Sequence, residues 1–325
     1  MKRLLFTSLL FGMALALNAQ QVDYNVVSVD GENELNLVKV TSDDDQVCMP
    51  EVKRNGKELE WWSSRVIGMS PTSNELGYLS YKNNTSNLFV RGLENGESAR
   101  QRTNRQLVLD FSFSPDGEKI CFTEQQGKMN RVFITDANKG FVSRQITENT
   151  LDYAPVFSPD MQQIFFARQE DTNLSIWSFN MDDNSVSSYT RGFNPFPMKD
   201  GKSIICTRRS ATGKCEIWKV DYSTGVEECI LSNPDCNYTT PSVSPDGEWI
   251  LVVGKSIIKT PNFSYPNTDI YVCRMDGTQL TQLTYHAAND VSPVWSNDGK
   301  YIYFVSQRGS AKASANVWRM NFNLK

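Results

Sequence analysis

Short apolar runs of four to seven residues alternate with polar turns along most of the chain, which predicts β-strands rather than helices. Many of the turns read Ser-Pro-Asp-Gly or a close variant. Pro and Asp-Gly favour a tight hairpin, and Gly supplies the positive φ that the hairpin needs. Four segments of this kind align closely with one another, namely 111–124, 155–168, 241–254 and 293–306. Two weaker copies, 66–80 and 195–208, complete the set.

The serine of that turn, or the residue in its place, recurs at positions 70, 114, 158, 198, 244 and 296. The steps are 44, 44, 40, 46 and 52 residues, and six copies at such a period are typical of a propeller with one blade per copy. In each copy the turn joins two apolar strands, and a third strand carries an aromatic residue. We therefore predict an all-β fold, a six-bladed β-propeller built from four-stranded antiparallel blades.

The later strands of each copy are also visible in the pattern. The expected third strands are 87–93, 131–137, 175–181, 216–222, 269–275 and 316–322. The expected fourth strands that end in threonine are 101–103, 145–147, 188–190 and 282–284. The last copy stops after its third strand, whereas residues 35–41 have the pattern of a fourth strand. We expect residues 35–41 to pair onto the last blade and close the ring, because an open ring would leave an exposed sheet edge.

The first residues have the pattern of a cleaved secretory signal, residues 1–19. Lys2 and Arg3 precede an apolar run from Leu4 to Leu17, which is shorter than the roughly 20 residues that a bilayer span needs. Cleavage is expected after Ala19, with Ala16 as the alternative. A periplasmic location follows, with secretion or attachment to the cell surface as the alternative. No later apolar stretch is long enough to span a membrane, so an integral membrane protein is not expected.

The remaining organisation is simple. An N-terminal segment, residues 20–34, adds a further strand or remains a tail, and the propeller occupies residues 35–325. Residues 42–64 have little pattern, and the pair Trp61-Trp62 there either packs on the first blade or forms a binding platform. The longest insertion, residues 255–268, carries apolar residues and prolines, which predicts a lid or a docking surface.

Composition narrows the function. A formal net charge of −4 argues against nucleic acid as a partner. The single histidine, His286, excludes a metal centre with several histidines in one chain, and we expect no metal and no cofactor. The seven cysteines leave at least one thiol unpaired and are expected to be mostly packed thiols. If a disulfide forms, Cys229–Cys236 and Cys206–Cys215 are the nearest pairs in sequence.

One stretch carries a family resemblance. Residues 290–308 and 315–322, with Asp-Gly-Thr-Gln-Leu-Thr-Gln-Leu-Thr at 276–284 before them, resemble the TolB-type propeller repeat, as do the other Ser-Pro-Asp-Gly copies. The resemblance covers about residues 35–325 and implies a TolB-like six-bladed propeller. The same repeat occurs in scaffolds, peptidase propellers and sugar-acid lyases. The separate α/β domain of TolB is not expected here. The lyases use several histidines around a divalent metal, which one histidine does not reproduce.

The face that carries the links between blades is the expected place for functional residues. No Gly-x-Ser-x-Gly elbow is present, so hydrolase chemistry of the peptidase relatives is not expected. The turn aspartates are expected to hold hairpins rather than calcium. Arginine with aromatic residues is typical of recognition sites. The candidate ligand-binding residues are Asp152, Tyr153, Arg168, Arg208, Tyr238, Tyr285, His286, Asp290 and Arg308.

These observations favour a non-enzymatic, exported, monomeric propeller that serves as a binding or scaffold protein of the cell envelope. Its partner would be an envelope protein, a peptide or a glycan. The alternative is a carbohydrate-active enzyme, hydrolase or lyase-like, that uses Asp152 and Asp290 at the mouth of the channel, with Asp110 close to the same level. A third hypothesis is a propeller subunit that acts with a separate catalytic partner.

Overall fold

The computed structural model describes residues 22–324 apart from residues 33, 51–63, 95–96, 140–142, 149–150, 172 and 262–263. Within those residues the regular elements are β-strands and one short 3-10 helix, η1 (Asp43–Asp45), so the predicted all-β class is confirmed. The expected signal segment, both expected cleavage positions and the Trp61-Trp62 pair lie outside the described residues.

The strands form antiparallel four-stranded units that follow the order of the sequence. Four units are separate sheets, and two share one eight-stranded sheet because Leu151 pairs in parallel with Asn130. The first three units contain β2 (Ile67–Met69), β3 (Glu75–Lys82), β4 (Thr85–Gly92), β5 (Arg100–Gln101), β6 (Val108–Phe113), β7 (Lys119–Gln126), β8 (Met129–Asp136), β9 (Ser143–Gln145), β10 (Leu151–Phe157), β11 (Gln163–Glu170), β12 (Asn173–Asn180) and β13 (Val186–Arg191). The others contain β14 (Phe193–Pro197), β15 (Ser203–Arg209), β16 (Cys215–Asp221), β17 (Glu227–Leu231), β18 (Cys236–Val243), β19 (Trp249–Lys259), β20 (Ser264–Arg274), β21 (Thr281–Gln282), β22 (Asp290–Trp295), β23 (Tyr301–Ser306) and β24 (Asn316–Asn321), with β1 (Val38–Lys39) beside β24.

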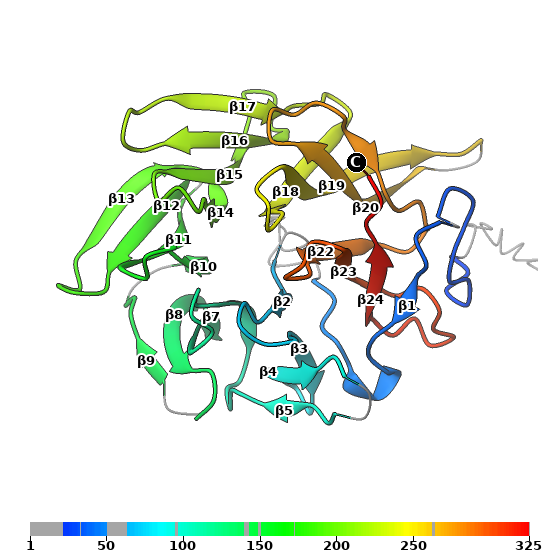
Figure 1. Ribbon diagram of the computed structural model, residues 1–325, viewed down its shortest axis with the longest axis horizontal. Helices are drawn as coiled ribbons and strands as arrows, with labels where there is room; N and C mark the ends of the chain where they lie inside the picture. The colour runs from blue at the N-terminus through cyan, green and yellow to red at the C-terminus, as the bar shows by residue number, and fades with distance from the viewer. Residues whose placement is uncertain are drawn as a thin grey trace, which may run out of the picture.

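These sheets surround a common centre, and β2, β10, β14, β18 and β22 lie nearest to it (Figure 1). The arrangement is a β-propeller. Apolar side chains from the faces of the sheets meet in a buried cluster that includes Leu79, Phe122, Leu251 and Phe304. All six expected third strands overlap observed strands. The four expected fourth strands that end in threonine also overlap observed strands, three of them at a single residue, namely Gln101, Gln145 and Gln282. The sequence pattern missed β17, which lacks that threonine.

The Ser-Pro-Asp turns are held by their own side chains. In the turn at 158–163, the Ser158 hydroxyl donates to Asp160 Oδ1 at 2.6 Å and accepts from the N–H of Gln163 at 2.9 Å. Asp160 Oδ1 also accepts from the N–H of Gln162, and these contacts, that of Ser158 foremost, lower the pKa of Asp160. Asp116, Asp246 and Asp298 make the same two contacts. Asp200, whose turn has Met198 in place of the serine, accepts from the N–H of Lys202. The expected structural role of the turn aspartates is therefore confirmed.

A second set of polar contacts joins neighbouring sheets near the centre. The position four residues before the turn serine is occupied by Val66, Asp110, Ala154, Asn194, Thr240 and Ser292. Asp110 Oδ2 accepts from the N–H of Ala154, and Ser292 Oγ accepts from the N–H of Val66, both at 2.9 Å. Each bond therefore links the same position in consecutive units. We call these six positions the central belt.

The segment 38–48 contacts both the last and the first unit. β1 pairs antiparallel with β24, with Val38 opposite Arg319, which is the pairing expected for residues 35–41. Asp43 accepts hydrogen bonds from Lys39, Ser310 and Asn316 of the last unit. Asp45 accepts from Tyr78 and Arg91 of the first unit at 2.7 and 3.0 Å. Asp43 and Asp45, both in η1, thus connect the last unit to the first.

The cysteines are packed as expected. All seven are free, so neither Cys229–Cys236 nor Cys206–Cys215 forms a disulfide. Five of the thiols are buried, and only Cys229 is exposed. Burial raises the pKa of Cys121 and Cys206 to about 12, so these thiols are protonated at neutral pH.

Replacing Met161 with glycine should stabilise the protein. Met161 stands where four of the other five copies have glycine. It has a φ of 62°, a left-handed conformation that is unfavourable for a side chain. We expect Met161→Gly to raise the free energy of unfolding by about 0.5–1 kcal/mol in denaturant titrations. Gly247→Ala is the matched control. Gly247 has a φ of 80° and an added Cβ would meet no atom within 4 Å, so only backbone strain should lower its stability. A neutral or destabilising Met161→Gly would contradict this account.

The contribution of Asp43 should depend on pH. Its hydrogen bonds, that from Lys39 foremost, lower its pKa from 3.8 to about 2. The lowered pKa means that the stabilisation is present above pH 4 and is lost as the pH falls through 2. Because the group is partly exposed, we expect Asp43→Asn to cost only about 1 kcal/mol at pH 6, and nothing near pH 2. Asp44→Asn, at the neighbouring exposed position, should leave the unfolding curve unchanged at every pH.

Candidate functional site

The antiparallel order of the strands divides the propeller into two faces. One face carries the Ser-Pro-Asp turns. The other carries the links between units and the turns between the second and third strands, and we call it the linker face. By their strand positions all nine candidate residues lie toward the linker face, at the beginning of a first strand, near the end of a second strand, or on a link.

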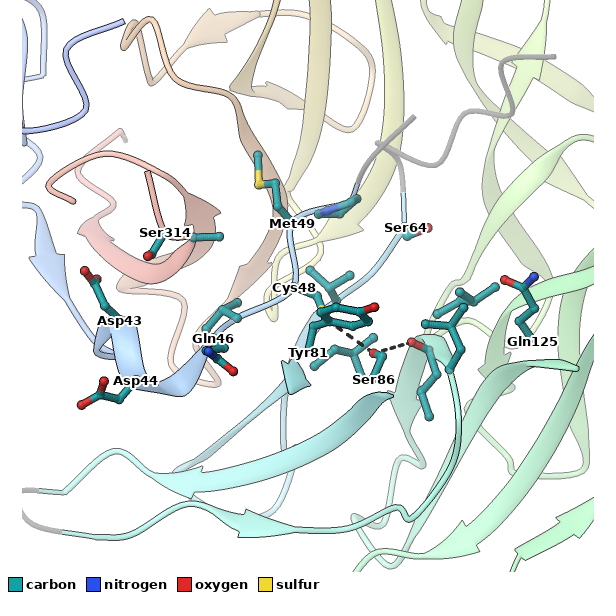
Figure 2. A pocket seen from close by; sticks show the side chains of 18 of the residues that line it. Asp43, Asp44, Gln46, Cys48, Met49, Ser64, Tyr81, Ser86, Gln125 and Ser314 are labelled. Atoms are coloured by element: carbon teal, nitrogen blue, oxygen red, sulfur yellow. Dashed lines mark hydrogen bonds between the residues drawn. The ribbon is translucent and has the colours of Figure 1, made fainter. Parts of the chain in front are cut away.

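A pocket of about 760 Å³ opens on the linker face between the last unit, the first unit and the next one. Its walls come from residues 43–50, from the first unit, from the start of β6 and from the loop after β23. Figure 2 shows Cys48, Tyr81 and Ser86 near its middle, with Asp44 toward one end and Gln125 toward the other. No signal in the sequence pointed to this pocket, because residues 42–64 carry no repeat pattern.

The pocket is mainly apolar at its base. Val47, Val66, Leu79 and Val108 line it and are buried. The Cys48 thiol lies 3.5 Å from the Ser86 hydroxyl, and burial raises the pKa of Cys48 to about 11. A thiol with that pKa is neutral at physiological pH and is therefore not poised as a nucleophile. The pocket can hold an apolar or aromatic group, with the exposed Tyr81 at its opening.

Asp152 and Arg168 form an ion pair with each other. They are opposite residues of β10 and β11, and Arg168 Nε lies 2.8 Å from Asp152 Oδ1. The guanidinium also stacks on the Trp177 ring at 4.3 Å from its centroid. The Asp152 side chain has no exposed surface, whereas that of Arg168 is 14% exposed. Tyr153 beside them is half-buried.

Arg208 and Tyr238 are also directed inward. Arg208 donates to both carboxylate oxygens of Glu227 at 2.7 Å and to the Thr190 hydroxyl. Tyr238 belongs to a buried apolar cluster and packs edge to face on Tyr271. The side chains of Arg208 and Tyr238 thus make their contacts with other residues of the protein.

Of the four remaining candidates, Arg308 and Asp290 belong to a buried charge cluster and His286 lies beside it. Arg308 lies 2.8 Å from Glu32 and 2.5 Å from Asp290, and none of the three side chains has exposed surface. His286 Nδ1 accepts from the N–H of Ala288 at 2.9 Å, and burial lowers its pKa, so its ring is neutral. Burial is also the largest cause that raises the pKa of Asp290 to about 6. Glu32 lies outside the repeats, and no pattern in the sequence pointed to it.

Six of the nine candidates are therefore buried, and Tyr285 alone is well exposed, at 47%. Ligand binding by these residues stays a prediction. The insertion forms the ends of β19 and β20, which are eleven residues each, and the hairpin extends away from the centre in Figure 1. Its role as a lid or a docking surface likewise stays a prediction.

Two further findings concern the part of the chain that the structure describes. No group of three or more His, Cys, Asp or Glu residues in it is arranged to hold a metal ion. None of the helical structure in it has the length and apolar character of a membrane span.

The fold and the repeats define a β-propeller protein of the Ser-Pro-Asp-Gly type. A sequence model of the TolB beta propeller domain matches residues 7–260, and the chain belongs to this family. The predicted resemblance is thus confirmed.

Solved structures of known proteins share this fold. A putative TolB from Agrobacterium tumefaciens has a TM-score of 0.60 at 18% identity, over 80% of this chain and 90% of that one. TolB from Acinetobacter baumannii has a TM-score of 0.61 at 17% identity, over 77% of this chain and 64% of that one. An oligogalacturonate lyase from Vibrio parahaemolyticus has a TM-score of 0.59 at 10% identity, over 93% and 97% of the two chains. At these identities the likeness concerns the fold alone.

A structural role for the Asp152–Arg168 pair can be tested by stability. Arg168→Met would leave a fully buried carboxylate without its guanidinium, and we expect a loss of about 3 kcal/mol in the free energy of unfolding. The matched control is Lys300→Met. Lys300 and Asp298 lie 3.5 Å apart with 74% and 48% of their side chains exposed, so the expected loss is below about 0.5 kcal/mol. Equal, small losses in both variants would contradict a structural role for the pair.

Proposed function

We propose that this chain is an exported, monomeric, six-bladed propeller that binds a protein, a peptide or a glycan of the cell envelope on its linker face. The four-stranded units and the β1–β24 pairing support six blades in a ring closed by residues 35–41. The pattern of residues 1–19 supports export, with the propeller over residues 35–325. A periplasmic location is consistent with both.

The observation that carries this proposal is the 760 Å³ pocket on the linker face. Concave apolar pockets of this size, formed where several elements meet, are the usual seats of ligands. The buried base suits an aliphatic or aromatic group, and Tyr81 and Gln125 at the opening offer polar contacts. Among the described residues that line the pocket, the charged side chains are Asp43, Asp44 and Lys312, and Asp43 is already bonded to Lys39, Ser310 and Asn316.

One observation favours the alternative, a carbohydrate-active enzyme. The pKa of Asp290 is raised to about 6, mainly by burial, as a general acid requires. Asp290 is fully buried and paired with Arg308, so a substrate would reach it only after rearrangement. Turnover of oligosaccharides, including oligogalacturonates, that Asp290→Asn abolishes would establish this alternative and displace the binding proposal.

The binding proposal is tested with two exposed tyrosines on opposite faces. Tyr81 lines the pocket, and Tyr222 lies near a turn on the other face. Purified wild type, Tyr81→Ala and Tyr222→Ala would be titrated against peptidoglycan fragments, an oligosaccharide array and fractionated envelope proteins. We expect Tyr81→Ala to weaken binding at least tenfold, about 1.4 kcal/mol, and Tyr222→Ala to leave it unchanged.

Thermal unfolding of both variants would establish that they are folded. Equal loss of binding in the two variants, or binding by neither the wild type nor any variant, would contradict the proposal.

A further inference from the structure

The N-terminal segment lies against the linker face instead of forming a further strand or a free tail. The carbonyl of Tyr24 accepts from the N–H of Ser310 at 2.9 Å, and that of Val26 accepts from Gly309 at 3.0 Å. The carbonyl of Val27 accepts from Arg308 Nη1 at 3.1 Å. We call residues 22–32 the latch. The latch contacts the loop after β23 through the three carbonyls just described and through the side chain of Glu32 at its C-terminal end.

Glu32 enters a site that is completely buried. Its carboxylate accepts from Arg308 Nη1 at 2.8 Å, from Arg308 Nη2 at 3.2 Å and from the N–H of Tyr285 at 2.7 Å. Arg308 also donates to Asp290 Oδ2 at 2.5 Å. Asp269 is 2% exposed and accepts from Asn267 Nδ2, which itself donates to the carbonyl of His286.

The cluster holds more acidic than basic groups. Glu32, Asp269 and Asp290 are three buried carboxyl groups, whereas Arg308 supplies one positive charge and His286 is neutral. Burial and the nearby Asp290 and Glu32 raise the pKa of Asp269 to about 8. Burial raises that of Asp290 to about 6, and Glu32 adds to the effect. Among the described residues, Asp269 Oδ1 has no hydrogen-bond donor facing it.

The other titratable groups near the cluster do not remove this excess. Asp23 of the latch lies near His286, where its charge favours the protonated ring, and it adds a further negative charge to this region. Cys236 and Tyr271 lie near Asp269, and burial raises the pKa of Cys236 to about 11 and that of Tyr271 above its usual value. Both are therefore neutral between pH 5 and 9, and the balance of charge rests on protons held by Asp269 and Asp290.

We propose that residues 22–32 form a proton-linked latch, which docks on the linker face while the buried cluster holds protons and is released as the protons leave. Docking brings the Glu32 carboxylate beside Asp269 and Asp290. Its negative charge raises the affinity of both groups for protons. By linkage, docking must then take up protons and weaken as the pH rises. Release leaves Arg308 paired with Asp290, so no buried guanidinium is left without a counter-ion.

The test is hydrogen exchange of the full chain, followed by mass spectrometry between pH 5.5 and 9 and corrected for the intrinsic exchange rate. We expect protection of residues 22–32 to fall at least tenfold from pH 6 to pH 9, while β11 keeps its protection. Glu32→Gln retains the hydrogen-bonding shape without the charge, and its protection should be independent of pH. Asp269→Asn should remove the part of the change that falls between pH 7 and 9.

Asp30→Asn is the matched control, because Asp30 is an exposed acid on the same segment. It should behave as the wild type does. The proposal is overturned if wild-type protection is the same at pH 6 and 9, if Asp30→Asn changes the profile as much as Glu32→Gln, or if β11 loses protection together with the latch. If Glu32→Gln fails to fold, Asp269→Asn decides the question alone, and an unchanged profile in that variant overturns the proposal.

Discussion

The arrangement of the sheets depends on the strand pairing of β1 with β24 and on Asp43 and Asp45, which follow β1. Together they hold the last unit next to the first. A propeller sheet buries both of its faces against neighbours, so the first and last sheets need a covalent or hydrogen-bonded link to stay together. Here the link is a pair of residues in β1 with Asp43 facing the last unit and Asp45 facing the first. Because the same segment continues along the pocket, the fold and the candidate site depend on one stretch of chain.

Polar contacts of the described residues join the units near the centre of the propeller. Bonds of the central belt join consecutive units, and Arg65 reaches across to the carbonyl of Pro195 at 2.8 Å. Burial lowers the pKa of Arg65 to about 10, so the guanidinium is still charged at neutral pH. A charged side chain bonded across the centre competes with any ligand there. This favours the pocket at the junction of the first and last units as the place for recognition.

The repeat predicted the class, the strands and the role of the turn aspartates, because each of these is a local property of one copy. It did not predict which charged groups pair with one another. Arg168 and Arg208 occupy equivalent ends of second strands, yet one bonds Asp152 and the other Glu227, since glycine stands at position 192. Glu32 and the pocket residues before Pro50 lie outside the repeats altogether. Contacts of this kind depend on distant chain segments, and a periodic pattern carries no signal for them.

The loop between β23 and β24 contacts both the latch and the candidate pocket on the linker face. Its first residues, Arg308 and Ser310, contact the latch, and Ser310 Oγ also donates to Asp43 at 3.0 Å. Its later residues, Lys312 and Ser314, line the pocket. Coupling between sites requires an element whose contacts both sites change. A ligand that displaced this loop from the pocket side would alter the hydrogen bonds that hold the latch. Conversely, release of the latch on loss of protons would change the position of the loop residues that line the pocket.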